Sequence, residues 1–213
     1  MDQNSKRCWN VLTWNVRGIN AAWKWDAVKN KIVPSCCDIF CLQETKREIF
    51  DSVFLRNICP SSFDNFEFIP SLGASGGILV AWKGSCFSGT RIFSNNFCVS
   101  IEFCSVHNND SWVLTCVYAP CSPDGKLVFL EWLKNIQMPD NVDWLLLGDF
   151  NLIRKPEDRN RPGGSLSEMA LFNEAISSLG INEVLLQGRK FTWSNVQTPP
   201  LMEKLDWVFT SNS

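Results

Sequence analysis

An α/β fold is the class that the sequence predicts, because strand-like and helix-like segments alternate along its 213 residues. The chain opens with a strand over residues 9–16, a helix over 21–33 and a strand over 38–42. Short apolar runs, bounded by turn-forming residues, then alternate with two further helical patterns. Such a mixture typically forms helical layers around packed β-sheets.

Each element is expected from its own apolar pattern and boundary residues. Helices are predicted over residues 21–33, 127–136 and 167–179, and strands over 9–16, 38–42, 77–82, 97–104, 112–118, 144–147, 191–194 and 205–209. Pro34 is expected to end the first helix, because proline does not continue a helical run. Ser167 is expected to cap the last helix and Gly180 to end it.

Composition favours one intracellular globular domain spanning residues 1–213. The chain is 45% hydrophobic and has a formal net charge of -2, so no overall cationic field indicates nucleic acid. Its ten cysteines show no CxxC pair and only one histidine is present, which argues against zinc and for free thiols in a reducing compartment. Neither an N-terminal apolar segment nor a stretch of membrane-spanning length is found, so no membrane association is expected.

Polar residues recur where predicted strands end. They are Asn15, Glu44, Tyr118, Asp149 and Asn151. A strand end presents a side chain rigidly to a cleft, and a few carboxylates and amides suit Mg²⁺, or Mn²⁺ in its place. Taken singly, each has a simpler explanation as a turn, cap or first-turn residue, so the indication comes from the set.

Two residue types occur only once in the sequence, and only one of the two residues is a candidate for the active site. Tyr118 is the single tyrosine, whereas phenylalanine and tryptophan are common, which suggests that its hydroxyl matters. His107 lies in the polar stretch VHNND between two predicted strands. We expect His107 in a solvated hairpin loop rather than in catalysis.

Six short motifs, taken in order, resemble those of the endonuclease/exonuclease/phosphatase family. They are WNVRG at 14–18, QET at 43–45, VYAP at 117–120, GDFN at 148–151, FTWSN at 191–195 and LDW at 205–207. The resemblance implies a deoxyribonuclease-like four-layer α/β sandwich, in which two packed mixed β-sheets are flanked by helices. The stretch GDFNLIRKPEDRNRPGG further resembles the endonuclease domain of plant long interspersed element (non-LTR) retrotransposons.

The family resemblance assigns a role to each strand-end residue. It implies that Glu44 binds Mg²⁺ with help from Asn15. Asp149 and Asn151 would position or activate water and hold the scissile phosphate, and Tyr118 would stabilise the phosphate during the reaction.

One residue of the expected catalytic set has no counterpart in the sequence. Asp206 in LDW matches the acid that the family pairs with a catalytic histidine, although Trp207 replaces a common arginine. The later Ser-Asp-His motif that would supply the histidine is not found before Ser213. We therefore expect a domain that is incomplete at its C-terminus, lacks the last strand and has little or no activity.

Substrate contact is expected from a basic run and one aromatic residue. Arg154, Lys155, Arg159 and Arg161 follow GDFN and could grip DNA phosphates, with Trp193 of FTWSN as a further substrate-binding residue. Two acids interrupt the run, so a solvated loop with internal ion pairs is an equal alternative.

The predicted function is Mg²⁺-dependent nicking of DNA by a retrotransposon-derived protein. The resemblance implies a reverse transcriptase domain in full-length relatives and action in the nucleus. Two alternatives stay open: an inactive remnant that at most binds nucleic acid, and a phosphatase for lipid or inositol phosphates. The second is weaker, because neither an amphipathic membrane-binding stretch nor a concentrated cationic pocket is apparent.

Overall fold

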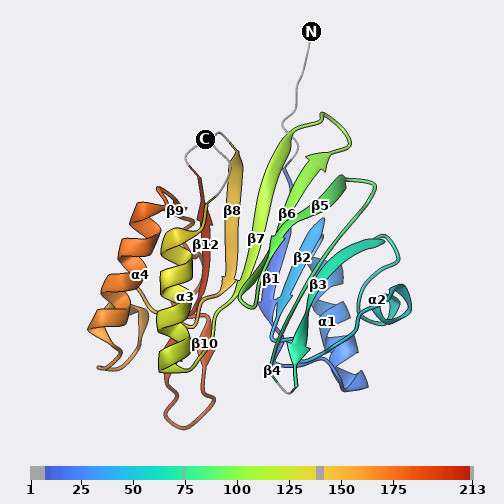
Figure 1. Ribbon diagram of the computed structural model, residues 1–213. Coiled ribbons are helices and arrows are strands. Elements are labelled where there is room, and N and C mark those ends of the chain that lie inside the picture. Colours follow the sequence, from blue (N-terminus) through green and yellow to red (C-terminus); the bar gives the residue numbers. More distant parts are fainter. Residues whose placement is uncertain (1–7, 74, 138–141, 212–213) are drawn as a thin grey trace. The chain divides into compact units, whose positions relative to one another are not determined.

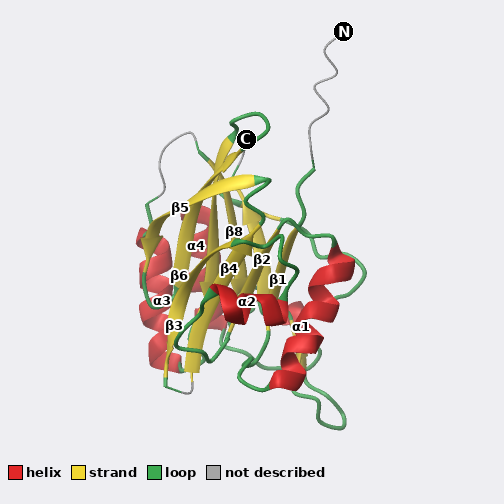
Figure 2. Ribbon diagram, turned by 90° about the vertical axis from the view of Figure 1, so that its right-hand side faces the viewer, coloured by secondary structure: helices red, strands yellow, loops and turns green. Residues whose placement is uncertain are grey.

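Two large mixed β-sheets, each accompanied by its own helices, account for most of the chain (Figures 1 and 2). The computed structural model describes residues 8–73, 75–137 and 142–211. The chain forms two compact units. Unit 1 takes its described residues from Met1–Ser88 and Ser105–Asn108, and unit 2 from Gly89–Cys104 and Asn109–Ser213. The predicted α/β class, with mixed sheets flanked by helices, is confirmed.

Unit 1 is built on a four-stranded sheet in the order β1-β2-β4-β3. Its elements are β1 (Val11–Asn15), α1 (Ala22–Ser35), β2 (Ile39–Gln43), α2 (Ser52–Ile58), β3 (Asn65–Leu72) and β4 (Ser75–Trp82). α1 carries the chain back along the sheet, so β1 and β2 run parallel, whereas β4 is antiparallel to β2 and β3. Val28 of α1, Phe54 of α2 and Phe40 of β2 belong to one buried core, which fixes the ends of β1 and β2.

Unit 2 contains most of a six-stranded sheet in the order β5-β6-β7-β8-β12-β9. Its elements are β5 (Phe87–Ser94), β6 (Cys98–Ser105), β7 (Ser111–Tyr118), α3 (Pro123–Asn135), β8 (Asp143–Asp149), the 3₁₀ turn η1 (Pro156–Asp158), α4 (Leu166–Ser178), β9 (Asn182–Glu183), β12 (Asp206–Thr210) and the ribbon β10 (Trp193–Ser194) with β11 (Met202–Glu203). β7 and β8 are parallel and are joined through α3, and β12 is antiparallel to β8. Phe129, Phe172 and Phe209 bring α3, α4 and the sheet into one core.

Helix ends differ from the predictions at two positions. Pro34 lies inside α1, which ends one residue later. A proline in the last turn forfeits only its own N–H, so the helix tolerates it there. The cap of α4 is Ser165, whose Oγ accepts from the N–H of Glu168 at 3.2 Å, and not Ser167. Gly180 follows the helix with φ +63°, as expected of a helix end.

Several elements were not predicted, although two carry a readable signal. α2 begins at Asp51, whose carboxylate accepts from the N–H of Phe54 at 2.7 Å. β3 alternates Phe66 and Phe68 and tolerates Pro70, because it is the edge strand of its sheet. The short strands β9 and β11 are defined by tertiary pairing and carry no periodicity of their own.

The cysteines, the length of the helices and the chain ends bear on the remaining expectations from the sequence. None of the ten cysteines forms a disulfide, and burial raises the pKa of the Cys59 thiol to about 12. No helix within the described ranges is long and apolar enough to cross a membrane. Residues 1–7 and 212–213, which bear on the expected absence of a targeting segment and on the C-terminal end of the fold, lie outside the described residues.

β7 and β8 come unusually close at Gly148, the first residue of the GDFN motif. Gly148 pairs with Val117 and has φ +136°, and a Cβ built on it would lie 2.0 Å from the carbonyl oxygen of Val117. Only glycine fits this backbone and this spacing. The residue therefore determines how Asp149 emerges from the sheet.

Replacing Gly148 with alanine should lower the free energy of unfolding by about 3 kcal/mol or more, through backbone strain and overpacking. Gly180→Ala is the matched control, because its φ is also positive but nothing lies within 4 Å of the built Cβ. It should cost about 1 kcal/mol. Urea denaturation of both variants measures the difference, and equal losses would contradict the close approach.

Ser165, which caps α4, and Ser167, in its first turn, should also behave differently. Ser165→Ala should lower the free energy of unfolding by about 1 kcal/mol, because the N–H of Glu168 loses its acceptor. Ser167→Ala should change it by less than about 0.5 kcal/mol. Thermal denaturation of both variants tests whether Ser165 is the cap. A larger loss of stability in Ser167→Ala than in Ser165→Ala would show that Ser167 is the cap instead.

Candidate active site

The candidate residues of unit 1 lie at the carboxyl ends of two parallel strands. Asn15 is the last residue of β1 and pairs with Gln43, the last residue of β2, so Glu44 follows directly beside it. The Oδ1 atom of Asn15 accepts from the N–H of Arg17 at 3.0 Å, which turns the chain away from the sheet. Asn15 and Glu44 thus lie at the same end of two neighbouring strands.

The backbone beside these residues is held in an unfavourable conformation. Arg17, Glu44 and Lys46 have φ values of +50°, +54° and +55°, although none is glycine. Backbone hydrogen bonds maintain the turn: the N–H of Gly18 donates to the carbonyl of Glu44 at 2.6 Å, and that of Lys46 to Gly76 at 3.0 Å. Strained residues of this kind cluster at functional sites when the surrounding structure over-determines them.

The donor set of unit 1 fits a hard divalent cation. The Glu44 carboxylate and the Asn15 amide are oxygen ligands, which Mg²⁺ uses together with water and substrate phosphate. Lys46 Nζ lies 3.1 Å from Glu44 Oε1, so this carboxylate already faces positive charge. Within the described ranges, no group of three or more histidine, cysteine or acidic side chains is placed to hold a metal ion.

In unit 2, three candidate residues stand in register across three adjacent strands. Asp149, the last residue of β8, pairs with Tyr118 at the end of β7 and with Asp206 at the start of β12. Residues paired across strands project from the same face of a sheet, about 5 Å apart. Asp149 is only 3% exposed, whereas Tyr118 and Asp206 are half-buried. The sheet thus groups a phenol and two carboxyl groups at one edge.

Asn151 joins this group through the turn that follows β8. Its φ is +49°, its backbone N–H donates to Asp149 Oδ1 at 3.0 Å, and its Nδ2 donates to the carbonyl of Ala119 at 2.7 Å. The amide side chain is therefore tied to the VYAP segment and the carboxylate of Asp149 to the GDFN turn. Two motifs that lie some thirty positions apart in sequence form one rigid unit.

A threonine that the sequence reasoning missed supports Asp206. Thr192 Oγ1 accepts from the backbone N–H groups of Leu205 at 3.0 Å and Asp206 at 3.1 Å. Trp207 Nε1 donates to the carbonyl of Leu152 at 2.9 Å. FTWSN and LDW are thus connected through Thr192, and GDFN joins them because the N–H of Phe150 donates to the carbonyl of Leu205 at 2.9 Å. The signal available in the sequence was that Thr192 belongs to the FTWSN motif.

The basic residues after GDFN separate into two kinds. Arg154 forms an ion pair with Glu183 at 2.7 Å and Arg159 with Glu203 at 3.3 Å, so both are engaged within unit 2. Lys155 and Arg161 are exposed, and the guanidinium of Arg161 also donates to the carbonyl of Pro199. The loop therefore combines the two arrangements considered from the sequence, internal ion pairs and cations open to solvent.

Trp193 and His107 lie in different settings. Trp193, on β10, packs against the buried cluster of Ile153, Met169 and Leu205. His107 lies in the exposed turn between β6 and β7 in unit 1, as predicted, with its ring 5.9 Å from that of Trp9.

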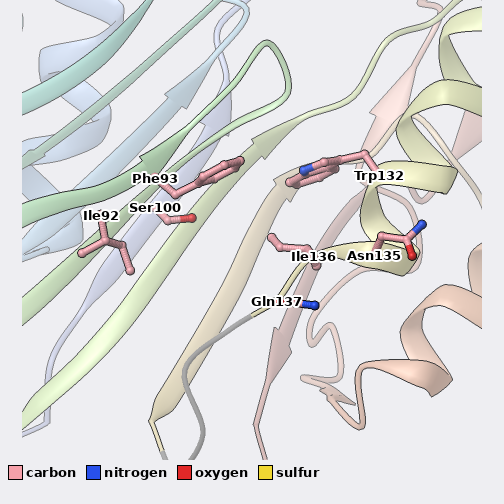
Figure 3. A pocket seen from close by; sticks show the side chains of 7 residues that line it. All are labelled: Ile92, Phe93, Ser100, Trp132, Asn135, Ile136 and Gln137. Carbon is pink, nitrogen blue, oxygen red and sulfur yellow. The ribbon is translucent and has the colours of Figure 1, made fainter.

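A cavity of about 470 Å³ in unit 2 lies apart from the predicted set (Figure 3). Side chains of β5, β6 and the C-terminal end of α3 surround it. Its lining residues are Ile92, Phe93, Ser100, Trp132, Asn135, Ile136 and Gln137. None of the residues singled out from the sequence lines this cavity.

Several solved structures share the fold. The AP endonuclease LMAP from Leishmania major is 16% identical with a TM-score of 0.70, covering 96% of this chain and 79% of that one. The catalytic domain of Xenopus laevis APE2 is 17% identical with a TM-score of 0.71, covering 95% and 82%. The endonuclease domain of TRAS1, a telomere-specific non-LTR retrotransposon, is 13% identical with a TM-score of 0.68, covering 96% and 86%.

These likenesses confirm the deoxyribonuclease-like fold class that the motifs predicted. No curated protein matches the chain. The sequence profile of the Endonuclease/Exonuclease/phosphatase family, however, matches residues 12–213, a span that includes every candidate residue in both units. The chain therefore belongs to the endonuclease/exonuclease/phosphatase family.

Proposed function

We propose that this chain hydrolyses phosphodiesters of DNA with the help of a bound divalent cation. The observation that carries the proposal is the register of Tyr118, Asp149 and Asp206 at one edge of the unit 2 sheet. Family membership over residues 12–213 favours phosphoester cleavage as the reaction class. Rigid polar groups at strand ends are the arrangement that in-line attack on phosphorus requires.

The residues of unit 2 would orient the nucleophile and the substrate. Asp149, almost fully buried and fixed by the N–H of Asn151, accepts a hydrogen bond from the attacking water. Asn151, held by Ala119, contributes an amide to the scissile phosphate. Tyr118 donates its hydroxyl proton in a hydrogen bond to a phosphate oxygen as negative charge builds there.

The residues of unit 1 would hold the cation. Glu44 and Asn15 would supply its protein oxygen ligands, and the cation would displace Lys46, whose Nζ lies 3.1 Å from Glu44 Oε1, from that carboxylate. When bound, Mg²⁺ or Mn²⁺ offsets charge on the phosphate oxygens.

We further propose that the chain derives from a retrotransposon. The stretch GDFNLIRKPEDRNRPGG and the fold shared with the TRAS1 endonuclease domain favour it. In this setting the enzyme would nick DNA, and the 3′-hydroxyl so exposed would prime a reverse transcriptase. The AP endonucleases of the same fold favour nucleic acid more generally.

A second candidate function is DNA binding without cleavage. The family resemblance pairs Asp206 with a histidine, and loss of such a general acid or base lowers a rate about 10²- to 10⁴-fold. The single histidine of the sequence, His107, lies in an exposed turn, where its ring stacks on that of Trp9.

Nicking of supercoiled plasmid in the presence of Mg²⁺ tests the hydrolytic proposal. Glu44→Ala and Asp149→Asn should each lower the rate about 100-fold or more, because one removes a cation ligand and the other the acceptor for water. Glu48→Gln and Asp143→Asn are the controls. Glu48 is exposed shortly after Glu44, and Asp143 is exposed at the opposite end of β8 from Asp149.

Each result distinguishes the candidate functions. Nicking that survives Asp149→Asn or chelation of the cation would refute the assigned site. Plasmid binding without nicking would leave the non-catalytic candidate, and hydrolysis of an inositol phosphate with intact plasmid would favour the phosphatase alternative.

Lys155 and Arg161 should bind DNA through phosphates. Lys155→Gln and Arg161→Gln, made in the Asp149→Asn background, should each weaken duplex binding at low salt. Each should also reduce the slope of log K against log salt by about 0.9, the value for one lost phosphate contact. Fluorescence anisotropy over a salt series measures the slope, and an unchanged slope would place the DNA elsewhere. Lys134→Gln, at an exposed position of α3, is the control.

A further inference from the structure

We infer that Arg154 is a positioning residue of the site in unit 2 and does not contact DNA. The inference rests on the proposed function, and it changes the role that the basic run suggested for this residue. Arg154 lies three positions after Asn151, in the segment that leaves β8.

The guanidinium of Arg154 is directed into unit 2 by specific partners. Its Nε donates to Asn173 Oδ1 at 2.8 Å and its Nη1 to Glu183 Oε2 at 2.7 Å, and its side chain is 24% exposed. Asn173 completes the connection, because its Nδ2 donates to the carbonyl of Arg154 at 2.7 Å. A planar guanidinium makes such a fork with fixed geometry.

The same group also stacks on the strand that carries Asp206. Its Cζ lies 5.6 Å from the ring centre of Trp207 and 5.7 Å from that of Phe209, both on β12. Trp207 also lies 4.1 Å from Lys204 Nζ, and Lys204 pairs with Glu183. Arg154 therefore joins the GDFN segment, α4, β9 and β12.

A buried carboxylate fixes the backbone of the same segment. Asp158, 6% exposed, accepts from the backbone N–H groups of Arg154 and Lys155 at 3.0 Å each. The carbonyl of Asp158 accepts from the N–H of Lys204 at 2.8 Å, one residue before Leu205. The segment that follows Asp149 is thus hydrogen-bonded to the segment that precedes Asp206. Asp158 makes this connection through the backbone, and Arg154 makes it through its side chain.

The alternative role, a phosphate contact, predicts a different response to lysine. Lysine retains the charge but has neither the fork nor the planar surface for stacking. A DNA contact would therefore survive Arg154→Lys in large part, whereas a positioning residue would not.

Steady-state nicking kinetics and amide hydrogen exchange test the inference together. Arg154→Lys and Arg154→Gln should both lower kcat about 10- to 100-fold with KM for DNA within about twofold, as misplacement of reacting groups does. Lys155→Gln, the adjacent exposed cation, should instead raise KM. Amides of residues 150–155 and 205–209 should exchange about tenfold faster in the two Arg154 variants, and at the unsubstituted rate in Lys155→Gln.

The exchange measurement separates this inference from the proposed function. If the unsubstituted chain does not nick, the proposed function fails, while faster exchange still supports positioning. The inference would be overturned if Arg154→Gln raised KM, Arg154→Lys kept KM at the unsubstituted value, and amide exchange were unchanged in both variants. Arg154 would then be a DNA contact. Arg154→Lys is the milder change, and its kinetics and amide exchange alone test the inference if Arg154→Gln does not fold.

Discussion

The parallel pairing of β7 with β8 is the constraint on which the arrangement in unit 2 depends. At Gly148 the two backbones lie too close for any side chain, so the register between these strands admits little variation. That register places Tyr118 beside Asp149, and the antiparallel addition of β12 places Asp206 on the other side. A shift of one residue in this register would turn these side chains to the opposite face of the sheet and would also turn the buried apolar side chains out of the core. The packing of the core therefore also sets the positions of the three polar residues.

Strand ends and the first turn residues after them provide the candidate groups in both units. Asn15 and Glu44 belong to one such edge, and Tyr118, Asp149 and Asp206 to the other. The turns that follow contain non-glycine residues with positive φ, Arg17 and Glu44 in unit 1 and Asn151 in unit 2. Buried strands of adequate stability can maintain such strain, which an isolated loop would relax.

Much of the fold and of the candidate set could be predicted from sequence, because both follow from local patterns. Buried strands such as Asp143–Asp149 are apolar runs, and the polar residues stand at their ends. The cap of α4 had a local signal that was overlooked, because Ser165 and Glu168 form the S-x-x-E pattern of a helix start, whereas Ser167 has no acid three residues later. Long-range contacts were less accessible: the sequence around Arg154 shows a cation, but its partners Asn173 and Glu183 are distant in the chain.

The ion pair between Glu44 and Lys46 has a consequence for the folded state. A carboxylate at the crowded end of two strands would normally require a counter-charge, and here the chain provides its own. Under the proposed function, loading of the cation would therefore be an exchange of charges: the divalent ion would take the place of the Lys46 ammonium beside the Glu44 carboxylate.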